Sequence, residues 1–284
     1  MPMHAHLRAT IDRFTALFAP DARCAGLHLK GSGGAGTDDA YSDVDLELVV
    51  QDAAYGAVSA ELRAVCERVC GAIRLWFPEG VRADGCNYAF LFEHEGQSFL
   101  YDFSIVTRSA LAGGTRRPGR ILLDRDGFLA GLRRDRAPAP YAPERLPYAI
   151  DRYWIYAYLS GKYTRRGDVL KLLYVQQTIF GAHLEVLRAL HPEGEWGWWP
   201  KDVGRLPAET QAALRRYFPA PDLPAIRTAL GDELRRFGAD ARAACARWEQ
   251  AYPEALERYV LRHLRAMGAV PDAPGDAPGD APGA

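Results

Sequence analysis

The chain has 284 residues, and its 36 Asp and Glu residues nearly balance its 35 Lys and Arg residues, for a net charge of −1. Because a dedicated nucleic-acid binder usually carries a basic excess, this balance argues against that class of protein. No stretch approaches the roughly 20 consecutive apolar residues that span a bilayer, and the first residues lack the apolar core of a signal peptide. We therefore expect a cytoplasmic protein of about two domains that has no membrane partner.

The five cysteines show neither a Cys-x-x-Cys pair nor the spacing of a zinc site. An odd number of unpatterned cysteines is typical of a protein in a reducing compartment. Cys66 and Cys70 are four residues apart in a predicted helix. We interpret them as buried thiols rather than as ligands.

The first half of the sequence predicts a mixture of helices and strands. Apolar residues at helical spacing predict helices over 7–18 and 53–73. Alternating and β-branched or aromatic segments predict strands at about 25–30, 43–50, 87–93, 98–106 and 121–124, the last of which we expect to close the sheet. The predicted fold class is α+β, with a mixed sheet.

One stretch of this half combines a glycine-rich turn with an acidic strand. Glycines at 31, 33, 34 and 36 let backbone N–H groups close around an anion, and the Ser32 hydroxyl adds a donor. Side chains alternate along a strand, so Asp43, Asp45 and Glu47 share one face. Neighbouring carboxylates repel each other by about 1 kcal/mol or more, which a bound divalent cation would relieve. Oxygen ligands on a rigid strand suit Mg²⁺.

This Gly-Ser pair followed by Asp-x-Asp at a strand start resembles the signature of the nucleotidyltransferase superfamily with the DNA polymerase β-type fold. The separation of Ser32 from Asp43 is most similar to the branch that contains aminoglycoside and lincosamide nucleotidyltransferases and the small nucleotidyltransferases of toxin–antitoxin pairs. The resemblance implies that Asp43 and Asp45 bind the metal while Gly31 and Ser32 position the nucleotide phosphates. The branch often carries Arg where Ala35 stands, so a cation near the phosphates must come from elsewhere. The alternative interpretation is a glycine-rich hairpin before an acid-edged strand.

A single carboxylate, Asp102, interrupts the apolar and aromatic strand over 98–106. A buried lone carboxylate is costly unless it is paired or bound to a metal. Superfamily members carry a third carboxylate on a later strand. The resemblance therefore implies that Asp102 is a third metal ligand or the base that takes the proton from the hydroxyl group of the acceptor molecule. Glu93 is the competing candidate. Asp102 could instead receive a local hydrogen bond or face solvent at a strand edge.

The second half of the sequence predicts helices. Three prolines predict a linker over 136–144, which separates a catalytic domain over 1–135 from a helical domain over 145–270. Asp168 is the predicted N-cap of a long helix. Helical patterns occur at 146–163, 168–190, 207–218, 222–248 and 253–267. The Asp-Ala-Pro-Gly repeats of 271–284 cannot build a core, and we expect disorder there.

Three lysines of this half are candidates for nucleotide binding. Lys162 and Lys171 lie among apolar and aromatic neighbours, so either one could neutralise a triphosphate; the alternative is an apolar stem packed on the surface with its ammonium in water. Lys201 follows the Trp196–Trp199 segment, whose rings either bind a ligand or fill the core. Arg116, Arg117 and Arg120 form either a solvated loop or a basic flap near the triphosphate.

The resemblance thus implies a Mg²⁺-dependent enzyme that transfers a nucleotidyl group from ATP, or another nucleoside triphosphate, to a hydroxyl of a small molecule. An aminoglycoside or a lincosamide-like antibiotic is the leading acceptor class, and antibiotic resistance would then be the biological role. One alternative keeps the chemistry but modifies a protein, as in a toxin–antitoxin pair. Another is a nucleotide-binding module without turnover, against which the three acidic residues argue. The oligomeric state stays open.

Overall fold

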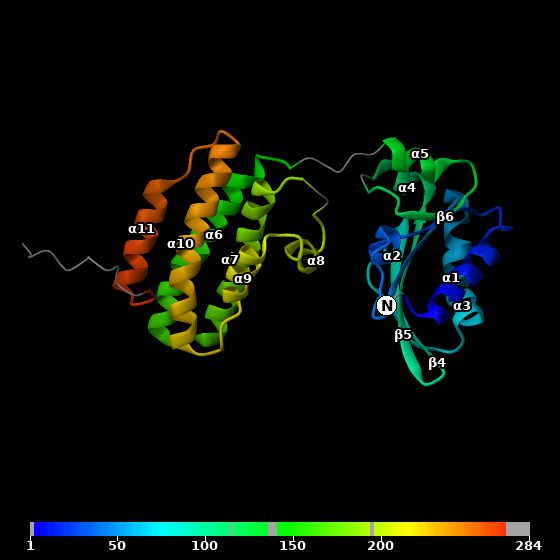
Figure 1. Cartoon of the computed structure of the whole chain (residues 1–284), viewed down its shortest axis with the longest axis horizontal. Helices are drawn as coiled ribbons and strands as arrows, with labels where there is room; N and C mark the ends of the chain where they lie inside the picture. The colour runs from blue at the N-terminus through cyan, green and yellow to red at the C-terminus, as the bar shows by residue number, and fades with distance from the viewer. Residues whose placement is uncertain (1–2, 115, 136–140, 194–195, 271–284) are drawn as a thin grey trace, which may run out of the picture. The chain divides into compact units, whose positions relative to one another are not determined.

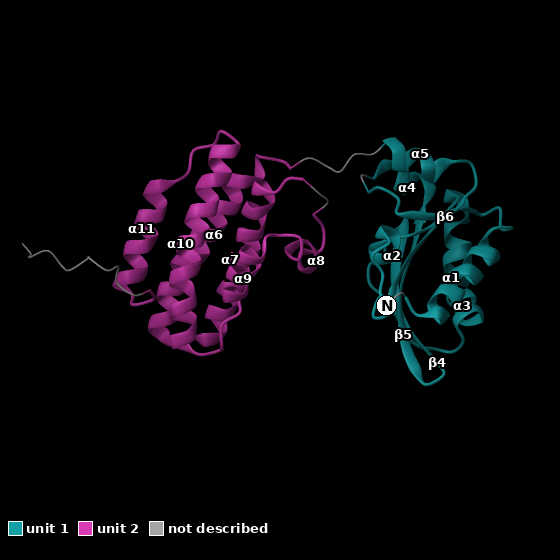
Figure 2. Ribbon diagram, in the orientation of Figure 1, with its two compact units in different colours: residues 1–139 teal, residues 140–284 magenta. Residues whose placement is uncertain are grey.

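The structure is a computed structural model that describes residues 3–114, 116–135, 141–193 and 196–270. The chain divides into two compact units, residues 1–139 and 140–284, shown in separate colours in Figure 2. The boundary falls inside the segment 136–144. The predicted disorder of 271–284 lies outside the described residues. No helix in the described ranges combines the length and apolarity that a bilayer crossing requires.

Unit 1 is built on a six-stranded sheet with the strand order β3-β4-β5-β2-β1-β6. Strands β2 and β5 run parallel, and the other neighbouring pairs run antiparallel, so the sheet is mixed as predicted. Strand β6 lies at one edge beside β1. The strands are β1 (Cys24–Leu29), β2 (Val44–Val50), β3 (Ile73–Pro78), β4 (Gly85–His94), β5 (Gln97–Thr107) and β6 (Arg120–Asp124).

Two helices, α1 (Ala5–Phe18) and α3 (Tyr55–Cys70), pack on the same face of the sheet (Figure 1). Phe14 of α1 and Leu62 of α3 share a core with the apolar side chains of β2, including Leu46 and Leu48. Because side chains alternate along β2, its acidic residues lie on the opposite face. The other helical segments in the described residues of this unit are short: α2 (Gly31–Ala35), the 3₁₀ turn Asp52–Ala54, α4 (Arg108–Gly113) and α5 (Phe128–Asp135).

The structure differs from the predicted elements of unit 1 in several places. The helix predicted over 53–73 ends at Cys70, because Gly71 adopts a left-handed φ of 92° that stops it, and Ile73 begins the unpredicted strand β3. The glycine turn at 31–36 is not flexible chain but the short helix α2. Helices α4 and α5 were not predicted.

Unit 2 is helical, as predicted. Its four long helices are α6 (Arg145–Arg166), α7 (Val169–Leu190), α10 (Leu223–Arg247) and α11 (Glu254–Ala266), joined by α8 (Trp199–Val203), α9 (Ala208–Leu214) and a 3₁₀ turn (Arg215–Tyr217). Asp168 is the N-cap of α7, because its side chain accepts a hydrogen bond from the Lys171 backbone N–H. Tyr153, Trp154 and Phe237 lie fully buried at the centre of this unit. The α+β class, a mixed sheet followed by helices, is therefore correct.

Candidate active site

The predicted carboxylates meet on the face of the sheet that α1 and α3 leave open. The parallel register of β2 and β5 pairs Asp45 directly with Asp102, and neighbouring strands lie about 4.8 Å apart. Asp43 stands one residue before β2 and has the same alternation as Asp45. Burial, followed by the negative charges of Asp45, Glu79 and Asp43, raises the pKa of Asp102 to about 6. The site therefore concentrates negative charge at one point of the sheet.

The Gly-Ser motif lies against this pair of carboxylates. Gly31 has a left-handed φ of 52°, and a Cβ atom placed on it would come within 1.7 Å of the Asp45 Oδ2 atom. The Lys30 backbone N–H donates to the Asp45 carbonyl over 2.8 Å. Only glycine therefore fits at position 31 without displacing the Asp45 carboxylate. Ser32 follows in the first turn of α2.

Two more glycines hold α2 against the chain that leads into β6. A Cβ atom on Gly34 would lie 2.5 Å from the Leu29 carbonyl oxygen, and one on Gly119 would lie 2.0 Å from the same oxygen. Both distances are shorter than a carbon–oxygen contact allows. The backbone of three segments is therefore packed closely around one carbonyl group of β1.

The donor set fits Mg²⁺ better than a metal held by the protein alone. Within the described ranges, no group of three or more His, Cys, Asp or Glu side chains could hold a metal ion. Mg²⁺ commonly takes only one or two carboxylates, keeping waters and substrate phosphates for the rest of its shell. The register pair Asp45 and Asp102, with Asp43 nearby, supplies such carboxylates. The metal itself stays a prediction.

A second row of polar side chains lies two residues further along the same strands. Glu47 is only 2% exposed, yet its carboxylate is 3.1 Å from His28 Nε2, 3.1 Å from Arg116 Nη2 and 3.5 Å from Lys30 Nζ. Burial alone would raise the pKa of Glu47, but the His28 hydrogen bond and the charges of Lys30 and Arg116 lower it to about 2. Glu47 is therefore a buried carboxylate with three partners.

The backbone fixes the tautomer of His28. The Gly119 N–H donates to His28 Nδ1 over 3.3 Å, so that nitrogen is the acceptor. The other ring nitrogen, Nε2, then carries the proton and donates it to Glu47 over 3.1 Å. His28 thereby links the segment before β6 to the centre of the sheet.

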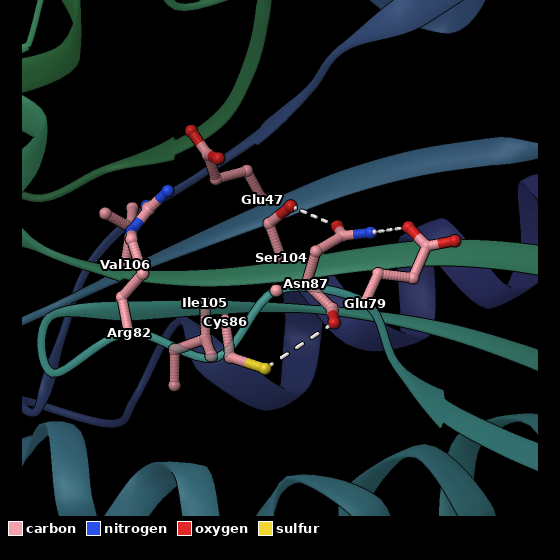
Figure 3. Close-up of a pocket in the computed structure, with 9 residues that line it drawn as sticks. Glu47, Glu79, Arg82, Cys86, Asn87, Ser104, Ile105 and Val106 are labelled. Carbon is pink, nitrogen blue, oxygen red and sulfur yellow. Dashed lines mark hydrogen bonds between the residues drawn. The ribbon is translucent and has the colours of Figure 1, made fainter.

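A directional chain of hydrogen bonds continues from Lys30 across the sheet, and Figure 3 shows its far part. Lys30 Nζ donates to Ser104 Oγ over 2.6 Å, Ser104 Oγ donates to Asn87 Oδ1 over 2.6 Å, and Asn87 Nδ2 donates to Glu79 Oε2 over 2.7 Å. Because an ammonium group only donates, each direction in this chain is fixed.

The side chains of Ser104, Asn87 and Glu79, which belong to this series of hydrogen bonds, border a cavity of about 250 Å³. Its polar walls carry two carboxylates, an amide, a hydroxyl and a guanidinium, and Ser104 lies two residues from Asp102 in β5. The cavity therefore lies beside the carboxylate site. The lining residues are Glu47, Glu79, Gly80, Arg82, Cys86, Asn87, Ser104, Ile105 and Val106 (Figure 3).

Glu93, the alternative to Asp102, lies away from the acidic pair. Strand β4 pairs Ala89 with Asp102 but Glu93 with Ser98. Four residues of strand span roughly 13 Å. Glu93 is exposed and lies 3.6 Å from Arg74, so the geometry favours Asp102.

The three lysines predicted to bind nucleotide belong to unit 2, and two of them have local partners. Lys171 Nζ lies 2.7 Å from the carboxylate of Asp168, the cap of its own helix. Lys162 Nζ lies 4.8 Å from the centre of the Tyr163 ring. Lys201 is exposed in α8. A role toward phosphate stays a prediction for all three.

The three tryptophans of the Trp196–Trp199 segment differ in burial, so neither predicted role, ligand binding or core filling, describes all of them. Trp196 packs against the core of unit 2 and donates from Nε1 to the His191 carbonyl over 2.9 Å. Trp199 packs edge-on against Phe180, with the ring centres 4.8 Å apart. Trp198 is 72% exposed. Trp196 therefore packs against the core, whereas Trp199 is 44% exposed and Trp198 presents most of its ring to solvent.

Sequence reasoning missed Lys30 and His28 as residues of the site. His28 in β1 and Lys30, the residue directly after it, alternate with Leu27 and Leu29, and this alternation places both on the same face. Arg116 of the basic loop reaches the site through Glu47, whereas Arg117 donates to the Arg133 carbonyl instead.

Comparisons with known proteins give little beyond this geometry. No family model matches the sequence, and no curated protein is significantly similar to it. Eleven chains among the solved structures match. One of them is an aminoglycoside 6-adenyltransferase from Bacillus subtilis, with 13% sequence identity, a TM-score of 0.45, and an alignment that covers 94% of this chain and 99% of that one.

Proposed function

We propose that the protein transfers a nucleotidyl group from a nucleoside triphosphate to a hydroxyl group of a small molecule in a Mg²⁺-dependent reaction. The register pairing of Asp45 with Asp102 beside Gly31 carries this proposal. Metal-dependent phosphoryl-type transfer needs carboxylates that bind the metal next to a segment that approaches phosphate closely. ATP is the donor that we propose first.

The three predicted carboxylates and the Gly-Ser motif each have a role in this proposed reaction. Asp43 and Asp45 bind Mg²⁺, and Gly31 and Ser32 hold the β- and γ-phosphates. When bound, the ion neutralises charge on the phosphates and on the pyrophosphate that leaves. The acceptor oxygen bonds to the α-phosphorus as the bond to the β-phosphate oxygen breaks, and the acceptor proton passes to Asp102, either directly or through water. The register pairing with Asp45 places the Asp102 carboxylate where it can serve as this general base.

The cavity beside Asp102 supports a polar acceptor. Its carboxylate, amide and hydroxyl groups suit a ring that carries hydroxyl or ammonium groups. Pockets for drug-sized ligands are usually larger, at roughly 300–1,000 Å³. We therefore propose that the cavity receives one part of a larger acceptor, with aminoglycosides and lincosamides as the first classes to test.

A screen of these antibiotics with labelled ATP tests the proposed function directly. We expect Mg²⁺-dependent pyrophosphate release with the wild-type protein, loss of release in Asp45→Asn, and a fall of about 10² or more in Asp102→Asn. Asp12→Asn is the matched control, because Asp12 is exposed on α1, which packs on the other face of the sheet. Undiminished release in a folded Asp45→Asn protein would overturn the metal assignment.

A further inference from the structure

We propose that Lys30 is a catalytic residue whose ammonium group contacts a phosphate oxygen of the bound nucleoside triphosphate. This inference rests on the proposed nucleotidyl transfer and supplies the cation that Ala35 does not provide. It assigns a function to a residue outside the Gly-Ser and Asp-x-Asp pattern.

The course of the Lys30 side chain brings its charge to the carboxylates. Its backbone N–H is bonded to the Asp45 carbonyl, and its Nζ atom reaches Ser104 in β5. The side chain therefore crosses β2 beside the Asp45–Asp102 pair.

The ammonium group retains capacity for a ligand. It has three N–H donors, and its partners within the described part of the chain are Ser104 at 2.6 Å and Glu47 at 3.5 Å. The Lys30 side chain is 25% exposed, whereas that of Glu47 is 2% exposed. One donor can therefore point out of the buried network toward a molecule bound on the open face.

Lys30 is more than a counter-ion for Glu47. His28 and Arg116 each approach Glu47 to 3.1 Å, which is closer than Lys30. The short contact of Lys30 is with the neutral hydroxyl of Ser104. A neutral anchor fixes the position of an ammonium group without cancelling its charge, and Asn87 in turn orients that hydroxyl. This arrangement suits a cation that must act on an incoming anion.

Binding of a non-hydrolysable ATP analogue, measured by calorimetry with Mg²⁺ present, tests this role independently of turnover. We expect Lys30→Met to weaken binding about 10- to 100-fold, because a charge-assisted hydrogen bond is lost. Lys30→Arg keeps the charge and should stay within several-fold of wild type. Arg63→Met is the control, because Arg63 lies on α3 and pairs with Glu67 at its surface.

The double variant Lys30→Met/Glu47→Gln separates ligand contact from charge balance. If Lys30 contacts phosphate, the second change restores thermal stability but leaves binding weak. Recovery of both stability and binding would overturn the proposal, as would unchanged binding in a folded Lys30→Met protein. If wild-type protein itself fails to bind the analogue, the proposed function falls together with this inference; binding by wild type and equally by Lys30→Met removes only the role of Lys30.

Discussion

Two glutamates, one in each unit, are buried to the same extent but titrate in opposite directions. Glu47 in the sheet and Glu233 in α10 are each 2% exposed. The pKa of Glu47 is lowered to about 2, whereas burial raises the pKa of Glu233 to about 9. Glu47 has three charged or hydrogen-bonding partners, whereas Gln176 and Arg216 favour the charged form of Glu233 too weakly to offset its burial. Partners, and not depth of burial, decide whether a buried carboxyl group ionises.

The comparison also separates two uses of a buried acid. Glu47 stays charged next to the candidate site, where it holds Lys30, His28 and Arg116 in place. Glu233 is a neutral carboxylic acid at neutral pH, surrounded by the helical core. The first arrangement keeps a buried charge beside the candidate site, whereas in the second Gln176 and Arg216 interact with the buried carboxyl group too weakly to keep it charged.

Removal of the best-placed partner of Glu47 should have the largest effect on stability. His28→Leu leaves the buried carboxylate without the one hydrogen bond that its Oε1 atom receives from His28, and we expect the free energy of unfolding to fall by about 3 kcal/mol. Urea-induced unfolding at pH 7 measures this change. His28→Gln, whose amide can still donate to Glu47, is the matched variant and should recover part of the loss. Equal stability of His28→Leu and wild type would show that the hydrogen bond from His28 does not stabilise the buried Glu47 carboxylate.

A change at Glu233 should act in the opposite direction. A carboxyl group whose pKa rises from 4.5 to about 9 on folding favours the folded state fully below pH 4.5, and this contribution is lost as the pH rises toward 9. Glu233→Gln removes the ionisable group, so we expect a gain of about 1–2 kcal/mol at pH 8 that shrinks at pH 5. Unfolding at the two pH values tests this, with Glu209→Gln, on the exposed face of α9, as control. A pH-independent effect would contradict the assignment.

The smallest expected effect is the loss of stability at low pH that comes from protonation of Glu47. Because the pKa of Glu47 falls on folding from 4.5 to about 2, its contribution is present above pH 4.5 and is lost as the pH falls toward 2. Between pH 4.5 and 3, the free energy of unfolding of the wild type should fall by about 1 kcal/mol more than that of the Glu47→Gln variant. Unfolding curves across this range measure the difference. Glu67→Gln, at the surface of α3, should follow wild type; if it instead follows Glu47→Gln, the slope does not come from the buried acid.

Local sequence patterns predicted much of the fold. Alternation predicted β1 and β2 nearly to the residue, and the prolines and helical spacing predicted the long helices of unit 2. Strand β3 was missed because Ile73 continues the apolar spacing of Leu62, Val65 and Val69, so the helical period extended past Gly71. A left-handed glycine is not visible in periodicity alone.

The site was predictable where a motif identifies it and not where it depends on strand register. The Gly-Ser and Asp-x-Asp spacing indicated Asp43 and Asp45, and a lone carboxylate in an apolar strand indicated Asp102, which the structure pairs with Asp45. Lys30 was missed because its partner Ser104 is 74 residues away and becomes a neighbour only through the parallel pairing of β2 with β5. Lys171, selected for its apolar surroundings, pairs with the cap of its own helix.

The close packing around the Leu29 carbonyl has a consequence for how this protein can change. Gly34 and Gly119 both approach the Leu29 carbonyl oxygen. A larger residue at one of these positions would need a smaller residue at the other to make room. No residue is smaller than glycine, so that room cannot be made. A substitution at one of these two positions therefore cannot be compensated by a substitution at the other. Directed evolution of this protein should leave both glycines unchanged and accumulate its changes around the cavity instead.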